Sequence, residues 1–243
     1  MSRTAVAFAL GAVGLLLVLV AQGAIAEAIW TYLGGVAKPI VPTPRLLALA
    51  GEHLGLTLMA IAPAALAGIG LGIVATRPAG AELRSPSDAM ATAAQAVPPV
   101  VVVALAVPAL GFGIGPTALA LFAYCLMPIL RATVSALEAA PRDARDAAEA
   151  MGFTPAQILW RIELPLAAGL IADAIRVALV LAIATAAVGA LAGAATLGTP
   201  IVTGLQNQNE LQILQGAAGT AALAFLSQGL FLAGLALFDA DEP

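Results

Sequence analysis

The longest stretch of the chain without a charged residue runs for 42 residues, from Ala89 to Leu130. Uncharged runs of this kind recur along most of the sequence. About 20 residues of α-helix cross the ~30 Å hydrocarbon core of a bilayer, so each run is long enough to span it. Charged residues make up only 10% of the 243 residues, and the mean hydropathy is +1.01, unlike an ordinary soluble domain. The chain is therefore predicted to be an all-α polytopic membrane protein.

About six transmembrane helices are expected. The 42-residue run is too long for one span and is broken at Gly111–Pro116, where glycine and proline favour a turn. The predicted helices cover residues 4–22, 54–75, 90–110, 116–136, 167–193 and 211–237. We treat residues 1–243 as a single transmembrane domain, with a core at 54–237 and an extra N-terminal helix at 4–22. The first segment ends in Ala24-Ile25-Ala26 and also fits a signal peptide, so its cleavage stays open.

The positive charges predict the orientation, because lysine and arginine are retained on the cytoplasmic side during insertion. Seven arginines fall on the side of the N-terminus and of the loops after the second and fourth helices. Only Lys38 and Arg45 fall opposite. Both termini and the polar loop at 138–165 are therefore predicted to be cytoplasmic.

The polar loop at 138–165 has the pattern of two short helices joined by a glycine. The first begins after Pro141, and Gly152 is expected to end it in a left-handed conformation. Thr154 to Gln157 is a capping box that starts the second helix. Leu164-Pro165 is expected to stop that helix, because proline disfavours helical geometry in the residue before it. These signals alone fit either a docking element or a solvated connector.

This loop resembles the EAA loop of ABC importer permeases, in which Glu-Ala-Ala is followed by three residues, Gly, nine residues, Ile, one residue and Leu-Pro. The matching positions are Asp146, Ala147, Ala148, Gly152, Ile162, Leu164 and Pro165. Asp146 stands where the family has Glu and keeps the charge. The resemblance implies that the loop inserts into a separate ATP-hydrolysing subunit and passes nucleotide-driven closure to the membrane helices as a rigid-body motion.

Four other segments resemble the osmoprotectant branch of these permeases, with the closest likeness to Yeh-type glycine betaine permeases. They cover residues 56–78, 95–116, 127–137 and 193–205. Many members of the branch carry two glycines where this chain has Ala195-Thr196. The resemblance implies a type I ABC importer permease fold, import of glycine betaine or choline, and a place in the bacterial cytoplasmic membrane. Another small solute is the alternative.

No ATP site is expected on this chain. The Gly-x-x-x-x-Gly-Lys-Ser/Thr motif that binds phosphate is missing, and Lys38 is the one lysine. ATP and Mg²⁺ are therefore expected on a pair of ATP-binding partner subunits, with no cofactor on this chain. The resemblance also implies a second permease subunit, the same or different, and an extracytoplasmic substrate-binding protein. Scattered basic residues argue against nucleic acid, and the apolar runs make the lipid bilayer a partner.

A few polar residues and prolines inside the predicted spans are candidates for lining a pathway. They are Gln95, Pro98, Tyr124 and Thr185. Such residues tend to face protein or a cavity rather than lipid, although helix packing alone also explains them.

Three further residues bear on rival functions. Asp173 and Arg176 are three apart on one helix and are expected to pair. His53 is expected at the outer edge of its helix, in the interface. Cys125 is expected to be a buried apolar residue.

Two rival classes are disfavoured. An ion-coupled secondary transporter would need embedded acids and related halves, and the sequence offers Asp173 alone and no internal repeat. An intramembrane enzyme would need convergent catalytic groups, yet His53 and Cys125 lie on different predicted helices. We therefore predict no catalytic and no metal-binding residues.

Overall fold

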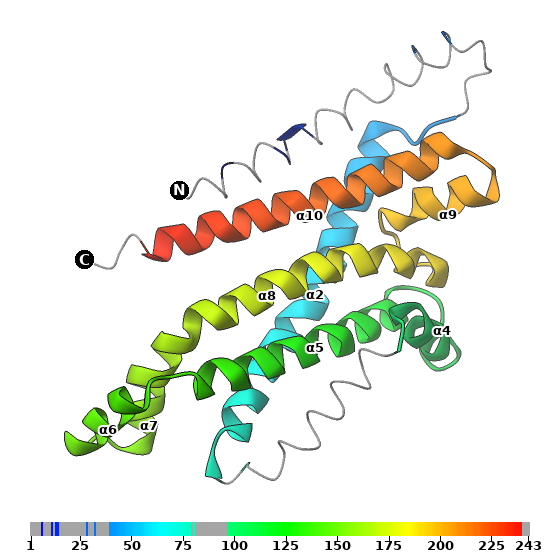
Figure 1. Cartoon of the computed structure of the whole chain (residues 1–243). Coiled ribbons are helices and arrows are strands. Elements are labelled where there is room, and N and C mark those ends of the chain that lie inside the picture. Colours follow the sequence, from blue (N-terminus) through cyan, green and yellow to red (C-terminus); the bar gives the residue numbers. More distant parts are fainter. Residues whose placement is uncertain are drawn as a thin grey trace. The chain divides into compact units, whose positions relative to one another are not determined.

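The structure, a computed structural model, describes residues 39–78, 80 and 97–239, together with positions 6, 11, 13, 14, 28 and 32 (Figure 1). All regular elements among the described residues between 39 and 239 are helices. They are α2 (Thr43–Ala75), α4 (Pro99–Leu110), α5 (Ile114–Glu138), α6 (Arg142–Ala150), α7 (Pro155–Ile158), η2 (Leu159–Glu163), α8 (Leu164–Ala186), η3 (Ala187–Ala192), α9 (Gly198–Gln206) and α10 (Glu210–Asp239). Most of the predicted helix at 4–22, residues 90–96 and Lys38 lie outside the described residues.

Among the described residues, four helices are long and apolar enough to cross a membrane. They cover Thr43–Ala75, Ile114–Glu138, Pro155–Ala192 and Glu210–Leu235. They correspond to four of the six predicted spans. α4 is a shorter apolar helix of 12 residues and corresponds to the second half of the predicted span 90–110. The prediction of an all-α, multi-pass protein is confirmed.

The predicted start of the second span at residue 54 is wrong, because α2 already begins at Thr43. The prediction places the start of the span after the last charged residues of the preceding segment. In the structure Arg45 and Glu52 instead lie on the exposed side and form an ion pair at 3.7 Å. Leu46 and Leu49 lie on the buried side. The first turns of α2 are thus amphipathic, which a count of uncharged residues misses.

The predicted helix stop at Leu164-Pro165 is also wrong, since α7, η2 and α8 form one continuous helix from Pro155 to Ala192. η2 is a wide turn in which the N–H of Leu164 donates to the carbonyl of Leu159, five residues back. Such local shifts of the hydrogen-bond ladder let a membrane helix accommodate a proline that cannot donate. Pro165 is therefore absorbed within the helix.

The segment between the last two predicted spans contains α9, which was not predicted. Figure 1 shows α9 beside the first turns of α10. A Cβ on Gly198 would lie 1.8 Å from the carbonyl oxygen of Ala187, so only glycine permits this approach. Close backbone packing, rather than a hydrophobic pattern, determines this part of the fold.

The described chain divides into two compact units. Of the described residues, unit 1 comprises those within Met1–Ala60, Pro99–Leu121 and Leu179–Pro243, and unit 2 comprises those within Ile61–Pro98 and Phe122–Ala178. Within unit 1, Val103 of α4, Ala120 of α5 and Ala192 of η3 form a buried cluster.

Unit 2 has its own core where α5 and α8 pack together. The buried residues are Ala136, Leu137, Ala167 and Ile171. α2 approaches α5 closely in this unit, because a Cβ on Gly72 would lie 2.7 Å from the Cβ of Thr133. Small residues at helix interfaces allow this kind of backbone contact in membranes.

Candidate functional site

The first arm of the polar loop is α6, which the structure ends at the predicted glycine. Gly152 has φ +82° and donates its N–H to the carbonyl of Glu149 at 2.9 Å. The N–H of Phe153 donates to the carbonyl of Ala148 at 3.0 Å. These two bonds satisfy the last carbonyls of α6 in a Schellman motif, which glycine favours because it has no Cβ.

The second arm begins with the predicted capping box. The N–H of Gln157 donates to Oγ1 of Thr154 at 3.3 Å, and the N–H of Thr154 donates to Oε1 of Gln157 at 2.8 Å. Pro155 occupies the first helical position, where a missing N–H costs nothing. The loop is therefore two defined helical arms joined at a fixed turn.

The seven positions that match the EAA pattern differ in exposure. Asp146, Ala147, Gly152 and Pro165 are exposed, Ile162 and Leu164 are half-buried, and Ala148 is fully buried. The buried Ala148 fixes which side of α6 faces the protein. Asp146 and Ala147 remain free for contact with another molecule.

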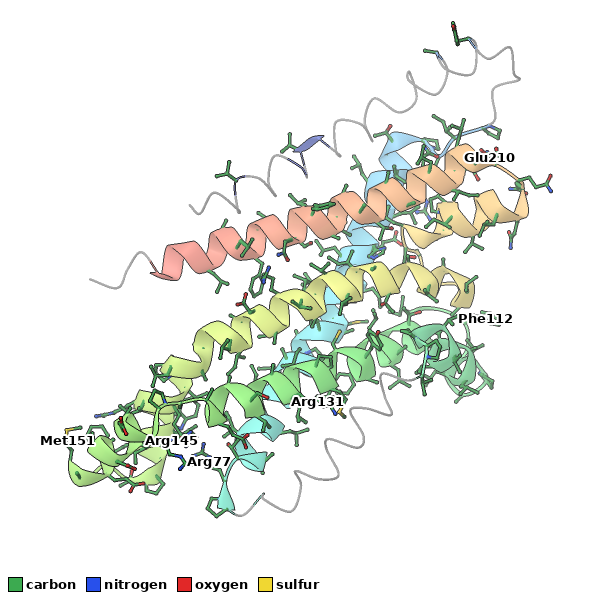
Figure 2. The ribbon with its side chains drawn as sticks, viewed as in Figure 1. Arg77, Phe112, Arg131, Arg145, Met151 and Glu210 are labelled. Atoms are coloured by element: carbon green, nitrogen blue, oxygen red, sulfur yellow. The ribbon has the colours of Figure 1, made fainter. Side chains whose placement is uncertain are left out.

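Two large apolar side chains that the sequence analysis did not select are exposed on this loop. Met151 and Trp160 are each 67% exposed, and Figure 2 shows Met151 at the loop's outer end. A cation–π contact also stabilises the turn at Gly152, because the guanidinium of Arg161 lies 5.9 Å from the ring centre of Phe153. The sequence signal that could have predicted this exposed apolar surface is the presence of large apolar residues close to a capped glycine turn.

A buried carboxylate ties the loop to the rest of unit 2. Glu163 of η2 is 4% exposed. Its Oε2 lies 2.5 Å from Nη2 of Arg77, which follows α2, and its Oε1 lies 2.8 Å from Nε of Arg145 in α6. Arg145 also donates through Nη2 to the carbonyl of Leu137 near the end of α5. Figure 2 shows Arg77 and Arg145 close together.

The cluster formed by Arg77, Arg145 and Glu163 was not predicted from the sequence. The one local signal for it in the sequence is an acid, Glu163, between the apolar residues Ile162 and Leu164. A charge in such a position requires partners.

The predicted pathway residues fall in different places. Gln95 lies outside the described residues, and Pro98 is exposed just before α4. Tyr124 in α5 and Thr185 in α8 are both half-buried. Their role in a pathway stays a prediction.

The predictions for two other sites are confirmed. Nε of Arg176 donates to Oδ1 of Asp173 at 3.0 Å, and Cys125 is buried. The prediction that His53 lies at the outer edge of its helix is wrong, and its side chain is fully buried. The cause is the earlier start of α2, which places position 53 inside the helix.

Within residues 39–78, 80 and 97–239 there is no group of three or more His, Cys, Asp or Glu side chains that could hold a metal ion. The fold and the loop together define a helical membrane component with a structured polar arm. Residues 68–240 match the family described as "Binding-protein-dependent transport system inner membrane component". The chain belongs to this family: it is a multi-pass inner-membrane transport component and not an enzyme.

Two relatives illustrate the match. The chain is 34% identical over 177 residues to the glycine betaine/carnitine/choline transport system permease protein OpuCD of Bacillus subtilis, covering 72% of this chain and 76% of that protein. It is 32% identical over 180 residues to the osmoprotectant import permease protein OsmW of Salmonella typhimurium, covering 72% and 83%. These names confirm the resemblance to the osmoprotectant branch.

The fold is also similar to a chain of the MetNI methionine ABC transporter in an inward-facing conformation. The TM-score is 0.70 at 23% identity, with 81% of this chain and 95% of that chain covered. This likeness confirms the predicted ABC permease fold.

Proposed function

We propose that this chain is the permease subunit of an ATP-driven importer for osmoprotectants such as glycine betaine, choline or carnitine. The observation that carries the proposal is the 34% identity to a permease named for these three solutes, over 72% of this chain. The likeness to a methionine transporter is lower, at 23% identity, and concerns the fold alone. Another small solute is the alternative.

The loop at 138–165 is, in this proposal, the cytoplasmic element that the ATPase binds. Support comes from the exposure of Asp146 and Ala147 beside the exposed apolar side chains of Met151 and Trp160. Large apolar groups that gather on an exposed element indicate a surface that another protein covers. The capped turn at Gly152 would hold both arms in one orientation for that contact.

The remaining subunits follow from this assignment. ATP and Mg²⁺ bind to a pair of ATPase subunits, a second permease subunit completes the pathway, and a soluble binding protein delivers the solute from outside. Gln95, Pro98, Tyr124 and Thr185 are the proposed pathway residues. Quaternary ammonium groups are recognised by aromatic faces, which this chain has in small number, so selectivity is assigned mainly to the binding protein.

Uptake by the complete complex in proteoliposomes tests the solute. Labelled glycine betaine, choline, carnitine and methionine are supplied separately, with and without ATP inside. We expect ATP-dependent uptake of at least one of the first three and none of methionine. Uptake of methionine alone, or uptake that needs a proton gradient instead of ATP, contradicts the proposal.

A cysteine cross-link tests the docking of the loop. The single native cysteine is removed by Cys125→Ala, and Met151→Cys is introduced as the reporter. A thiol at this exposed position is expected to cross-link to the ATPase subunit in the assembled complex. Glu52→Cys, also exposed but at the early part of α2, is the control and should not cross-link. The reverse pattern contradicts docking through this loop.

A further inference from the structure

Glu163 is a buried carboxylate whose two oxygens are bound by two different arginines. The residue is 4% exposed and lies on η2, the wide turn between the loop and α8. A buried charge is tolerated when each of its oxygens has a close, charged partner. Oε2 is held by Arg77 at 2.5 Å and Oε1 by Arg145 at 2.8 Å.

The two arginines come from different elements of unit 2. Arg77 is the second residue after α2, whereas Arg145 lies in the middle of α6. Arg145 extends the connection, since its Nη2 donates to the carbonyl of Leu137 in the last turn of α5. One carboxylate and two guanidinium groups therefore connect α6 to η2, to the end of α5 and to the segment that follows α2. Leu137 also belongs to the buried core between α5 and α8.

The pair Asp173 and Arg176 shows what an ordinary ion pair in the same unit looks like. Its N–O distance is 3.0 Å, both residues lie on α8, and the Asp173 side chain is 58% exposed. Such a pair spans one turn of one helix and connects no other element. The long reach of the contacts of Glu163, 86 residues to Arg77, is what distinguishes it.

We propose that Glu163 is the positioning residue that fixes the loop to the membrane helices of unit 2, so that displacement of α6 moves the ends of α2, α5 and α8 together. The inference rests on the proposed function, in which the ATPase grips this loop. Without the carboxylate, Arg145 loses its charged partner and α6 can turn without moving α2. Hydrolysis then continues while transport per ATP falls.

The test is the number of labelled glycine betaine molecules imported per ATP hydrolysed by the complete complex in proteoliposomes. Glu163→Gln keeps the shape of the side chain but cannot hold two guanidinium groups by charge. We expect the ratio to fall about tenfold, with hydrolysis retained, because removal of one buried partner leaves the others uncompensated. Asp173→Asn is the matched acid-to-amide control, and its ratio should stay unchanged. A ratio that Glu163→Gln leaves unchanged overturns the inference.

A double substitution separates a shared network from general damage. Residues that act through one network give effects that do not add. We expect Arg77→Met with Glu163→Gln to lower the ratio no further than Glu163→Gln alone. Two losses that multiply contradict a shared role.

The cross-link from Met151→Cys distinguishes failure of this inference from failure of the proposed function. A cross-link that persists in Glu163→Gln while the ratio falls supports the inference. A persistent cross-link with a normal ratio overturns the inference and leaves docking intact. A cross-link missing even without Glu163→Gln overturns the docking itself.

If Glu163→Gln does not reach the membrane, the same transport ratio is measured with Arg145→Lys, and that result tests the inference. Lysine keeps the charge but lacks the fork that reaches both Glu163 and the carbonyl of Leu137. The same fall in the ratio is expected, and a normal ratio overturns the inference.

Discussion

Nδ1 of His53 accepts a hydrogen bond from the backbone N–H of Leu197 at 3.1 Å, across 144 residues of sequence. Because Nδ1 is the acceptor, a neutral ring carries its proton on Nε2, which donates to the carbonyl of Ile183 at 2.8 Å. Both contacts lie in unit 1: Ile183 is in α8, and Leu197 directly precedes α9. The imidazole thus bridges a backbone carbonyl of α8 and the backbone N–H of the residue before α9.

We predict that His53→Leu destabilises the protein. The substitution leaves the buried N–H of Leu197 without its acceptor, at about 1–3 kcal/mol, and removes a second hydrogen bond, the one to the carbonyl of Ile183 in α8. Thermal unfolding of the detergent-solubilised chain, followed by size-exclusion chromatography, should show a Tm lower by about 5–10 °C. Glu52→Gln changes the exposed neighbour and should leave Tm unaltered. An equal Tm for His53→Leu and the unsubstituted protein would show that these bonds contribute nothing.

Gly72→Ala should also destabilise the protein, through steric conflict between α2 and α5. The added Cβ would lie 2.7 Å from Thr133, which forces the helices apart. Overpacking of this kind costs about 1–3 kcal/mol. Gly70→Ala is the matched control, because a Cβ there meets nothing within 4 Å. Equal losses of Tm in the two variants would contradict this close packing.

Gln215 of α10 binds the backbone of the segment before α2. Its Oε1 accepts from the N–H of Val41 at 2.8 Å, and its Nε2 donates to the carbonyl of Val41 at 3.0 Å. We predict that Gln215→Leu speeds amide hydrogen exchange at Val41 about tenfold, as expected for the loss of one net hydrogen bond. The exposed Gln206→Leu is the control. An unchanged rate of amide hydrogen exchange at Val41 would contradict a role for the two hydrogen bonds from Gln215.

The features that could be predicted from the sequence are those that neighbouring residues determine. The capping box at Thr154 to Gln157 and the left-handed Gly152 each depend on residues within a few positions. The spans follow from uncharged runs, which the bilayer requires whatever the packing.

The features that were not predicted depend on partners that are distant in the sequence, or on a helix that accommodates a proline or exposed charges. Glu163 finds Arg77 at a separation of 86 residues, and His53 finds Leu197 at a separation of 144. No local pattern encodes such pairs. The continuation of the helix through Pro165 depends on the wide turn in η2, which proline rules do not anticipate. The start of α2 at Thr43 does not follow from the uncharged runs, because the exposed Arg45 and Glu52 interrupt them.

The most direct test of the account measures ATP hydrolysis and glycine betaine uptake together in proteoliposomes that contain the complete complex with Gly152→Pro. Proline fixes φ near −65°, which is incompatible with the φ of +82° at this turn, so the two arms of the loop lose their relative orientation. Gly152→Asn is the control, because asparagine tolerates the left-handed conformation. The account predicts that Gly152→Pro inserts into the membrane and still hydrolyses ATP while uptake is lost. Uptake by Gly152→Pro at the level of the unsubstituted complex would contradict it.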